Sequence, residues 1–400
     1  MFGGLPGSAN RFFRLMKFLI TVAAMGSAAL VASCRSGPTS RTQVSSSGIG
    51  AYEAALATTA DGFVAAWYDI RDGNGEIYVR LLNADGEPAG PERRLTVDPE
   101  DSYEPSIEIV EDAMIVSWYA KSADGRLVPK LGAWDLDGRN RWVQTIAEIG
   151  RNPVLSVLPD DIFCAWIAPG PDGREWVWAG WWKLFGTAGV QRPLAPAGKT
   201  TWNVNAQATA VGQASVVFDA TAGTKADELF FVSIDQDQID VRRITADDGF
   251  PSKYPDVAGS APMAISWFDE RDGNTEVYLF VGTESDLTPE IDARARRVTT
   301  TPGESIGAYL DWSDEADLAS RRIGLAWSDA STGQHEVYFQ SLDGSGMPLG
   351  DPRRVTTTPT SSLVPAIRPW RGGFALAWNE FRPGPEAHAG TSEIAFAIVR

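Results

Sequence analysis

Short apolar segments that end in an aromatic residue recur along the whole chain at a nearly constant interval. The segments are rich in Val, Ile and Ala, as in VAAW, IVSW and ALAW, and they lie about fifty residues apart. The aromatic residues are Trp67, Trp118, Trp166, Phe218, Trp267, Trp327 and Trp378. A repeat of this length is typical of solenoids and propellers. The pattern therefore predicts seven units of one architecture.

Each unit contains four short apolar runs separated by Gly, Asp and Pro, and none of the runs has the 3.6-residue period of a helix. In the first unit the runs are AYEAALA, GFVAAW, EIYVRLL and ERRLTV, which we name strands a, b, c and d. Four antiparallel strands per unit indicate propeller blades. The sequence predicts an all-β, seven-bladed β-propeller, with six or eight blades as alternatives. A proline is expected to open the next strand a, at Pro105, Pro153, Pro255 and Pro365.

The last unit lacks a strand d, because the chain ends at Arg400 after the run SEIAFAIVR. The run RTQVS at 41–45 precedes the first strand a, just as a strand d precedes strand a elsewhere. We therefore predict that this N-terminal strand completes the seventh blade and closes the ring, which covers two exposed sheet edges. Residues 41–400 would then form a single propeller domain.

The first 33 residues have the features of an export signal. Arg11, Arg14 and Lys17 precede the apolar run FLITVAAMGSAALVAS, which is too short for a typical spanning helix. The following VASC resembles a bacterial lipobox, in which the cysteine becomes the lipidated first residue. The resemblance implies lipidation at Cys34 and a cell-envelope location, at the outer membrane or cell surface of a bacterium. A plain secretory signal and a retained membrane anchor are the alternatives.

The expected organisation is therefore a lipoprotein signal peptide at 1–33, a tether at 34–40 and the propeller. The chain has only one other cysteine, Cys164, which lies in the apolar run DIFCAW and is expected to be buried. We expect a monomer that touches the membrane only through its lipid.

One motif, Trp-x-Asp-x6-Glu-[Ile/Val]-Tyr, occurs at the same spacing in three units. Its residues are Trp67, Asp69, Glu76 and Tyr78, then Trp267, Asp269, Glu276 and Tyr278, then Trp327, Asp329, Glu336 and Tyr338. In units 1 and 5 an Asp-Gly pair supplies the turn of a hairpin between strands b and c. The motif resembles the TolB-like propeller repeat of exported bacterial proteins. At the level of fold the chain is also similar to sialidase-like propellers, whose S-x-D-x-G-x-T-W turn it lacks.

The oxygen-bearing side chains of this motif allow two interpretations. Asp69, Asp72, Asn74 and Glu76 could bind Ca²⁺, but their spacing differs from that of a calcium loop, and Arg71 lies among them. Repetition in several blades favours a structural role, in which Asp and Arg join the hairpin to its surroundings. We therefore expect no metal and no cofactor, with Ca²⁺ as the alternative.

Charge and the missing catalytic motifs narrow the class of function. A formal net charge of −17 argues against nucleic acid and anionic lipid headgroups as partners. His335 and His388 lie in different units, and no Gly-x-Ser-x-Gly motif is present. We predict a noncatalytic propeller that presents a binding face to a protein or glycan partner. The alternative is a carbohydrate-active enzyme, a glycoside hydrolase or lyase-like protein, that uses carboxylates in the central funnel.

Two features indicate where a partner binds. The b–c and d–a loops share one face and are rich in acidic residues, whereas the loops of the other face are small turns. Tryptophans concentrate in units 2 and 3, and in EWVWAGWWKLF the alternation of a strand places Trp181 opposite the other three. The predicted contact residues are Asp98, Glu100, Asp101, Glu104, Arg71, Arg271, Trp176, Trp178, Trp181 and Trp182.

Overall fold

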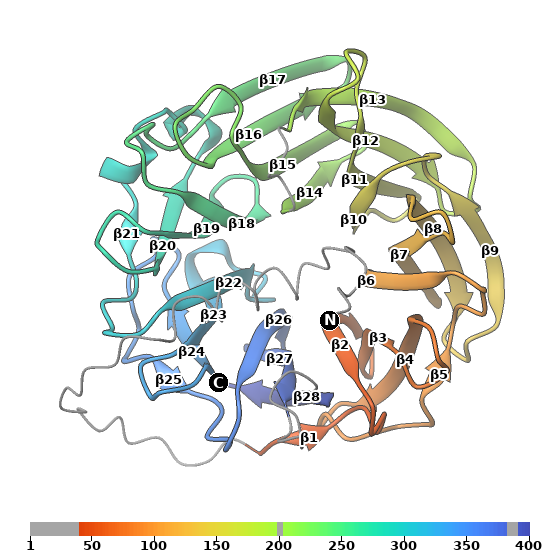
Figure 1. Ribbon diagram of the computed structural model, residues 1–400. Helices are drawn as coiled ribbons and strands as arrows, with labels where there is room; N and C mark the ends of the chain where they lie inside the picture. Colours follow the sequence, from red (N-terminus) through yellow and green to blue (C-terminus); the bar gives the residue numbers. More distant parts are fainter. Residues whose placement is uncertain (1–39, 198–202, 382–390) are drawn as a thin grey trace, which may run out of the picture.

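The computed structural model describes residues 40–197, 203–381 and 391–400, and its strands form seven four-stranded antiparallel sheets. Figure 1 shows these sheets as blades around a central axis, with the first strand of each blade innermost. The seven-bladed, all-β propeller predicted from the sequence is therefore confirmed. Within the described ranges, no helix is long and apolar enough to cross a membrane.

Blades 1 to 3 follow one another along the chain. Blade 1 consists of β2 (Ala51–Thr59), β3 (Gly62–Asp69), β4 (Glu76–Asn83) and β5 (Arg93–Arg94). Blade 2 consists of β6 (Asp101–Val110), β7 (Ala113–Lys121), β8 (Leu127–Asp135) and β9 (Asn140–Thr145). Blade 3 consists of β10 (Arg151–Val157), β11 (Asp161–Pro169), β12 (Glu175–Lys183) and β13 (Ala188–Pro196).

Blades 4 to 7 complete the ring. Blade 4 consists of β14 (Val204–Ala210), β15 (Gln213–Ala220), β16 (Glu228–Asp235) and β17 (Gln238–Arg243). Blade 5 consists of β18 (Ser252–Gly259), β19 (Met263–Asp269), β20 (Glu276–Gly282) and β21 (Arg296–Arg297). Blade 6 consists of β22 (Ser305–Trp312), β23 (Ile323–Asp329), β24 (Glu336–Leu342) and β25 (Arg353–Arg354). Blade 7 consists of β26 (Ser362–Trp370), β27 (Gly373–Phe381), β28 (Ser392–Val399) and β1 (Thr42–Gln43). Three 3₁₀ turns lie in the connections, at η1 (Glu284–Asp286), η2 (Ile291–Ala293) and η3 (Leu318–Ser320).

The hydrophobic core lies between neighbouring blades. The aromatic residue near the end of each strand b is at most 2% exposed in all seven blades. Between blades 1 and 2, for example, Ala66 and Val79 pack with Met114 and Trp118. Each blade thus buries both faces, which explains why the b strands are almost continuously apolar.

The pairing of the inner strand with its neighbour has a register shift in all seven blades, and in six of them the shift lies near the start of the inner strand. In these six blades, a residue at the interruption of the a–b pairing has a positive φ. These residues are Glu53, Glu104, Asn152, Tyr254, Gly307 and Val364. Four of them precede a proline, so Pro105, Pro153, Pro255 and Pro365 lie inside strand a. The prediction that these prolines open the strand was wrong, because a bulge also supplies a position that needs no ladder donor.

The ring closes through β1, as predicted. Thr42 pairs with Phe396 and Gln43 with Ala395, and the Val44 N–H donates to the Ile394 carbonyl at 2.8 Å. Val44 is fully buried in the core of blades 7 and 1. The N-terminal segment therefore provides the outer strand of the last blade.

Candidate functional site

The repeated Asp and Arg side chains join the b–c hairpin to its own blade. Asp69 accepts a hydrogen bond from Trp67 Nε1 at 3.0 Å and forms an ion pair with Arg71. The Arg71 guanidinium also contacts Glu92 and lies 4.7 Å from the centre of the Tyr78 ring. These contacts occupy Arg71 within the repeat, which favours the structural interpretation.

Blade 5 repeats this arrangement with its own residues. Arg271 pairs with Asp269 and Asp292 and lies 5.0 Å from the centre of the Tyr278 ring. Glu276 accepts a hydrogen bond from Arg297 at 2.8 Å. The two arginines predicted as partner contacts, Arg71 and Arg271, are thus both held by internal ion pairs.

The four acidic residues predicted as contacts separate into two groups. Asp98 and Glu100 lie on the d–a loop, where their carboxylates are 3.3 and 3.6 Å from Lys130 Nζ. Asp101 accepts a hydrogen bond from the Gly75 N–H at 3.0 Å. Glu104 differs from these three, because it is the bulge residue of β6 and is only 8% exposed. The structure places it inside the ring rather than on the loop surface.

The tryptophans of β12 mostly pack against the core. Trp182 is 1% exposed, and Trp178 stacks on Trp166 with 6.3 Å between ring centres. Trp181 packs against Phe163 on the opposite face of the blade, as the strand alternation predicts. Trp176 is partly exposed, and its Nε1 donates to Asp172 at 2.9 Å. The strand therefore presents no broad aromatic surface.

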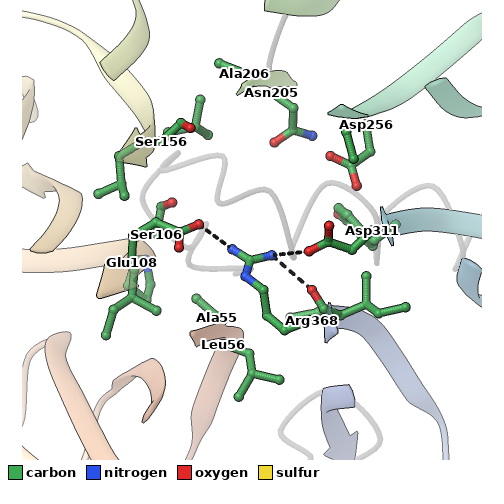
Figure 2. A pocket seen from close by; sticks show the side chains of 18 of the residues that line it. Ala55, Leu56, Ser106, Glu108, Ser156, Asn205, Ala206, Asp256, Asp311 and Arg368 are labelled. Atoms are coloured by element: carbon green, nitrogen blue, oxygen red, sulfur yellow. Dashed lines mark hydrogen bonds and ion pairs between the residues drawn. The ribbon is translucent and has the colours of Figure 1, made fainter. Parts of the chain in front are cut away.

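A cavity of about 410 Å³ runs along the axis and is lined by the inner strands of all seven blades. Figure 2 shows side chains from different blades converging on it. The bulge residues Glu53, Glu104 and Asn152 lie at the end where the d–a loops enter. Glu104 accepts hydrogen bonds there from Asn152 Nδ2 at 2.6 Å and from the Tyr119 hydroxyl at 3.2 Å. The b–c/d–a face thus leads to a polar entrance.

A second charged cluster lies deeper, towards the a–b turns. Arg368 of blade 7 reaches across blade 1 and donates to Glu108 of blade 2 at 2.8 Å. Its other terminal nitrogen donates to the Ile367 carbonyl at 2.9 Å and lies 3.9 Å from Asp311 of blade 6. Blade 1 presents Ala55 near the guanidinium, and this small side chain leaves room for it, whereas the side chain of Leu56 points away into the core (Figure 2). Groups from three blades therefore meet at one point of the cavity.

Burial sets the protonation of this cluster. Loss of solvent raises the pKa of Asp311 to about 7; Arg368 opposes the rise, and Glu108 and Asp256 add to it. The pKa of Glu108 is also raised by burial, against the effect of Arg368. Asp311 therefore changes charge close to neutral pH.

Glu108, Asp311 and Arg368 are not among the contact residues predicted from the sequence. Each is a charged residue inside a short, mostly apolar segment of an inner strand, in SIEIV, AYLDW and AIRPW. Because both faces of a blade are covered by its neighbours, a charge in such a strand has to point to the axis. That signal was present, but only the ring brings the three residues together.

The histidines and cysteines provide no second candidate site among the described residues. His335 is buried and its pKa is lowered by desolvation to about 4, whereas His388 and Cys34 lie outside the described residues. Cys164 is fully buried, as predicted, which raises its pKa. Over the described part of the chain, no group of three or more His, Cys, Asp or Glu residues is arranged to hold a metal ion.

Comparisons with known proteins identify the fold and no family. No protein-family model and no curated protein matches the chain. A protein of unknown function from Dyadobacter fermentans is 10% identical, with a TM-score of 0.51, and the match covers 90% of this chain and 97% of that one. An α-L-arabinofuranosidase from Fusarium graminearum is 12% identical, with the same TM-score and the same coverage of both chains. At these identities the likeness shows the propeller fold alone, which serves enzymes and binding proteins alike.

Proposed function

We propose that the protein is a cell-envelope lipoprotein whose noncatalytic propeller binds the polar end of a glycan or protein partner in its central cavity. The observation that carries this proposal is the meeting of Arg368, Glu108 and Asp311 inside the ring. The three groups stand on rigid inner strands and present donors and acceptors to one space. A volume of about 410 Å³ lies in the range of cavities that hold small molecules.

The b–c/d–a face is the side from which we expect the partner to approach. Asp98, Glu100 and Asp101 lie at the start of β6 or just before it, and Glu104 and Glu108 follow on the same strand. One strand thus connects the acidic loop with both polar levels of the cavity. The aromatic contribution is smaller than the sequence analysis expected, because most of the β12 tryptophans pack in the core.

Anchoring follows from the lipobox-like segment. Cys34 precedes Arg41 by only seven residues, so an extended tether spans at most about 25 Å. A lipid on Cys34 would therefore hold the outer edge of blade 7, where β1 lies, close to the bilayer surface. The acidic surface fits such an arrangement, because it disfavours direct adsorption to anionic headgroups.

The test uses soluble protein, residues 35–400, in a glycan array and in pull-downs from the native host. Arg368→Ala and Glu108→Gln remove the cross-cavity ion pair, and Asp85→Asn on an exposed c–d turn is the matched control. We expect capture to fall about tenfold or more in the two cavity variants and to stay unchanged in the control. Capture that is equal in all four proteins would refute the cavity as the binding site.

A carbohydrate-active enzyme is the second candidate, favoured by the two carboxylates on either side of Arg368. Burial raises the pKa of both Glu108 and Asp311, and a pair of carboxyl groups can serve as acid and base in glycoside hydrolysis. Aryl glycosides, including an α-L-arabinofuranoside, provide the assay. We expect no hydrolysis; turnover that is lost in both Glu108→Gln and Asp311→Asn would replace the binding proposal with this one.

A further inference from the structure

The guanidinium of Arg368 is fixed on one side and open on the other. Its Nη2 donates to Glu108 at 2.8 Å and its Nη1 to the Ile367 carbonyl at 2.9 Å. These two bonds come from different blades and hold the group across the cavity. The side that faces Asp311 makes no hydrogen bond with it, because the closest atoms are 3.9 Å apart.

Asp311 faces this gap with one oriented oxygen. Its Oδ1 accepts the Trp312 N–H at 2.8 Å, which fixes the carboxyl group. Its Oδ2 lies 3.9 Å from Arg368 Nη1, beyond hydrogen-bond distance. A charged N–H···O contact would close to about 2.8 Å if the pair met directly. The two atoms are therefore held apart by the ring.

A separation of this size has the dimensions of one bridging oxygen. A hydroxyl group forms hydrogen bonds of about 2.8 Å, so a single oxygen can contact both Arg368 Nη1 and Asp311 Oδ2. When Asp311 is ionised, the hydroxyl group accepts from the guanidinium and donates to the carboxylate at the same time. An ammonium group only donates and meets the positive charge of Arg368, whereas a carboxylate only accepts and meets Asp311 and Glu108.

The other residues of the cavity wall extend this preference for a neutral hydroxyl group to a whole sugar ring. Ser106, Asn205 and Asp256 line the cavity around the cluster and carry further donors and acceptors (Figure 2). Ala55 provides a small apolar surface beside Arg368, which suits the C–H face of a sugar. Alternating hydroxyl and C–H surface is the chemistry of a neutral carbohydrate.

Building on the proposed function, we infer that the cavity binds a neutral sugar residue, one hydroxyl group of which bridges Arg368 Nη1 and Asp311 Oδ2. The neutral sugar is the end of the glycan partner, and charged sugars are selected against. The 3.9 Å gap gives the site its specificity, because only a group that both donates and accepts satisfies its two sides.

The experiment measures binding of soluble protein to the methyl glycosides of glucose, galactose, mannose and arabinofuranose by saturation-transfer NMR and calorimetry. The neutral sugar that binds best is then compared with its amino analogue and its uronic-acid analogue. We expect both charged analogues to bind about tenfold or more weakly. Asp311→Ala should weaken the neutral sugar by a similar factor and reduce its advantage over the uronic acid, whereas Asp85→Asn should change neither. Melting curves of the variants check that the ring is intact.

Equal affinity of neutral and charged analogues, or unchanged affinity in Asp311→Ala, would overturn the inference. So would the absence of binding by all four glycosides at millimolar concentration. The proposed function is decided separately, by the Arg368 and Glu108 variants in partner capture. A captured partner that depends on Arg368 but carries no neutral sugar would leave the proposed function standing and refute this inference.

Discussion

Glu228 and Glu276 occupy the same position of the repeat but have different surroundings. Each accepts a threonine hydroxyl, and Glu276 also accepts Arg297 at 2.8 Å. In blade 4 the corresponding Arg243 points to Asp247, 4.0 Å away. Glu228 Oε1 is consequently buried without a hydrogen-bond partner among the described residues. Burial raises the pKa of Glu228 to about 7.

The pKa difference sets the size of the effect. A rise from 4.5 to about 7 corresponds to about 3 kcal/mol of lost stability once Glu228 is ionised in the folded state. Between these pH values the folded protein keeps a proton that the unfolded chain has released, so stability decreases as the pH rises through this window. Glu228→Gln removes the charge. We expect it to match the wild type near pH 4 and to be more stable by about 3 kcal/mol at pH 8.

Glu276→Gln is the matched control, for which we expect the opposite change in stability. It removes the ion pair and replaces one of the two oxygens that accept from Arg297 and Thr299 by an NH2 group, which should destabilise the protein by about 2 kcal/mol at pH 8. Scanning calorimetry at pH 4 and pH 8 measures both variants. A Glu228→Gln protein that melts below the wild type at pH 8, or a stabilised Glu276→Gln protein, would refute the reasoning.

Three further predictions concern the closure of the ring by β1, the membrane location of the protein and the charge of the cavity. A chain that starts at residue 47 loses β1 and the burial of Val44, several hydrogen bonds in all, and should melt roughly 10 °C lower, whereas a chain that starts at 41 should melt like residues 35–400. Equal melting temperatures for the two truncations would contradict closure by β1. Cys34→Ser should release the protein from native-host membranes, and mass spectrometry should find a diacylglyceryl group on Cys34 of the wild type; unchanged fractionation would rule out the lipid anchor. Asp311→Asn should stabilise the protein relative to the wild type, and more so at pH 8 than at pH 5, because burial raises the pKa of Asp311 to about 7. A stability difference between variant and wild type that does not change with pH in calorimetry would contradict this.

The b–c hairpins are the part of the fold that the local sequence pattern predicted best. The spacing from Trp67 to Tyr78 placed the b–c turn correctly, because the two residues that it brings into register, Asp69 and Glu76, pair directly across strands β3 and β4. The same register holds in blades 5 and 6. Contacts of this kind join residues close in sequence, so the repeat itself encodes them. The bulges could not be predicted from the pattern, since a proline is compatible both with the first position of a strand and with a bulge inside one.

The sequence by itself determined the repeat, the four strands of each blade, the number of blades and the strand that closes the ring. These properties follow from the alternation of apolar and turn residues within about fifty residues, and from one missing strand at the C-terminus. Only the tertiary structure decided which charges share a space. Glu108, Asp311 and Arg368 belong to blades 2, 6 and 7 and lie far apart in the sequence. Closure of the ring brings their inner strands to one axis, where the three charged groups are buried close together and interact.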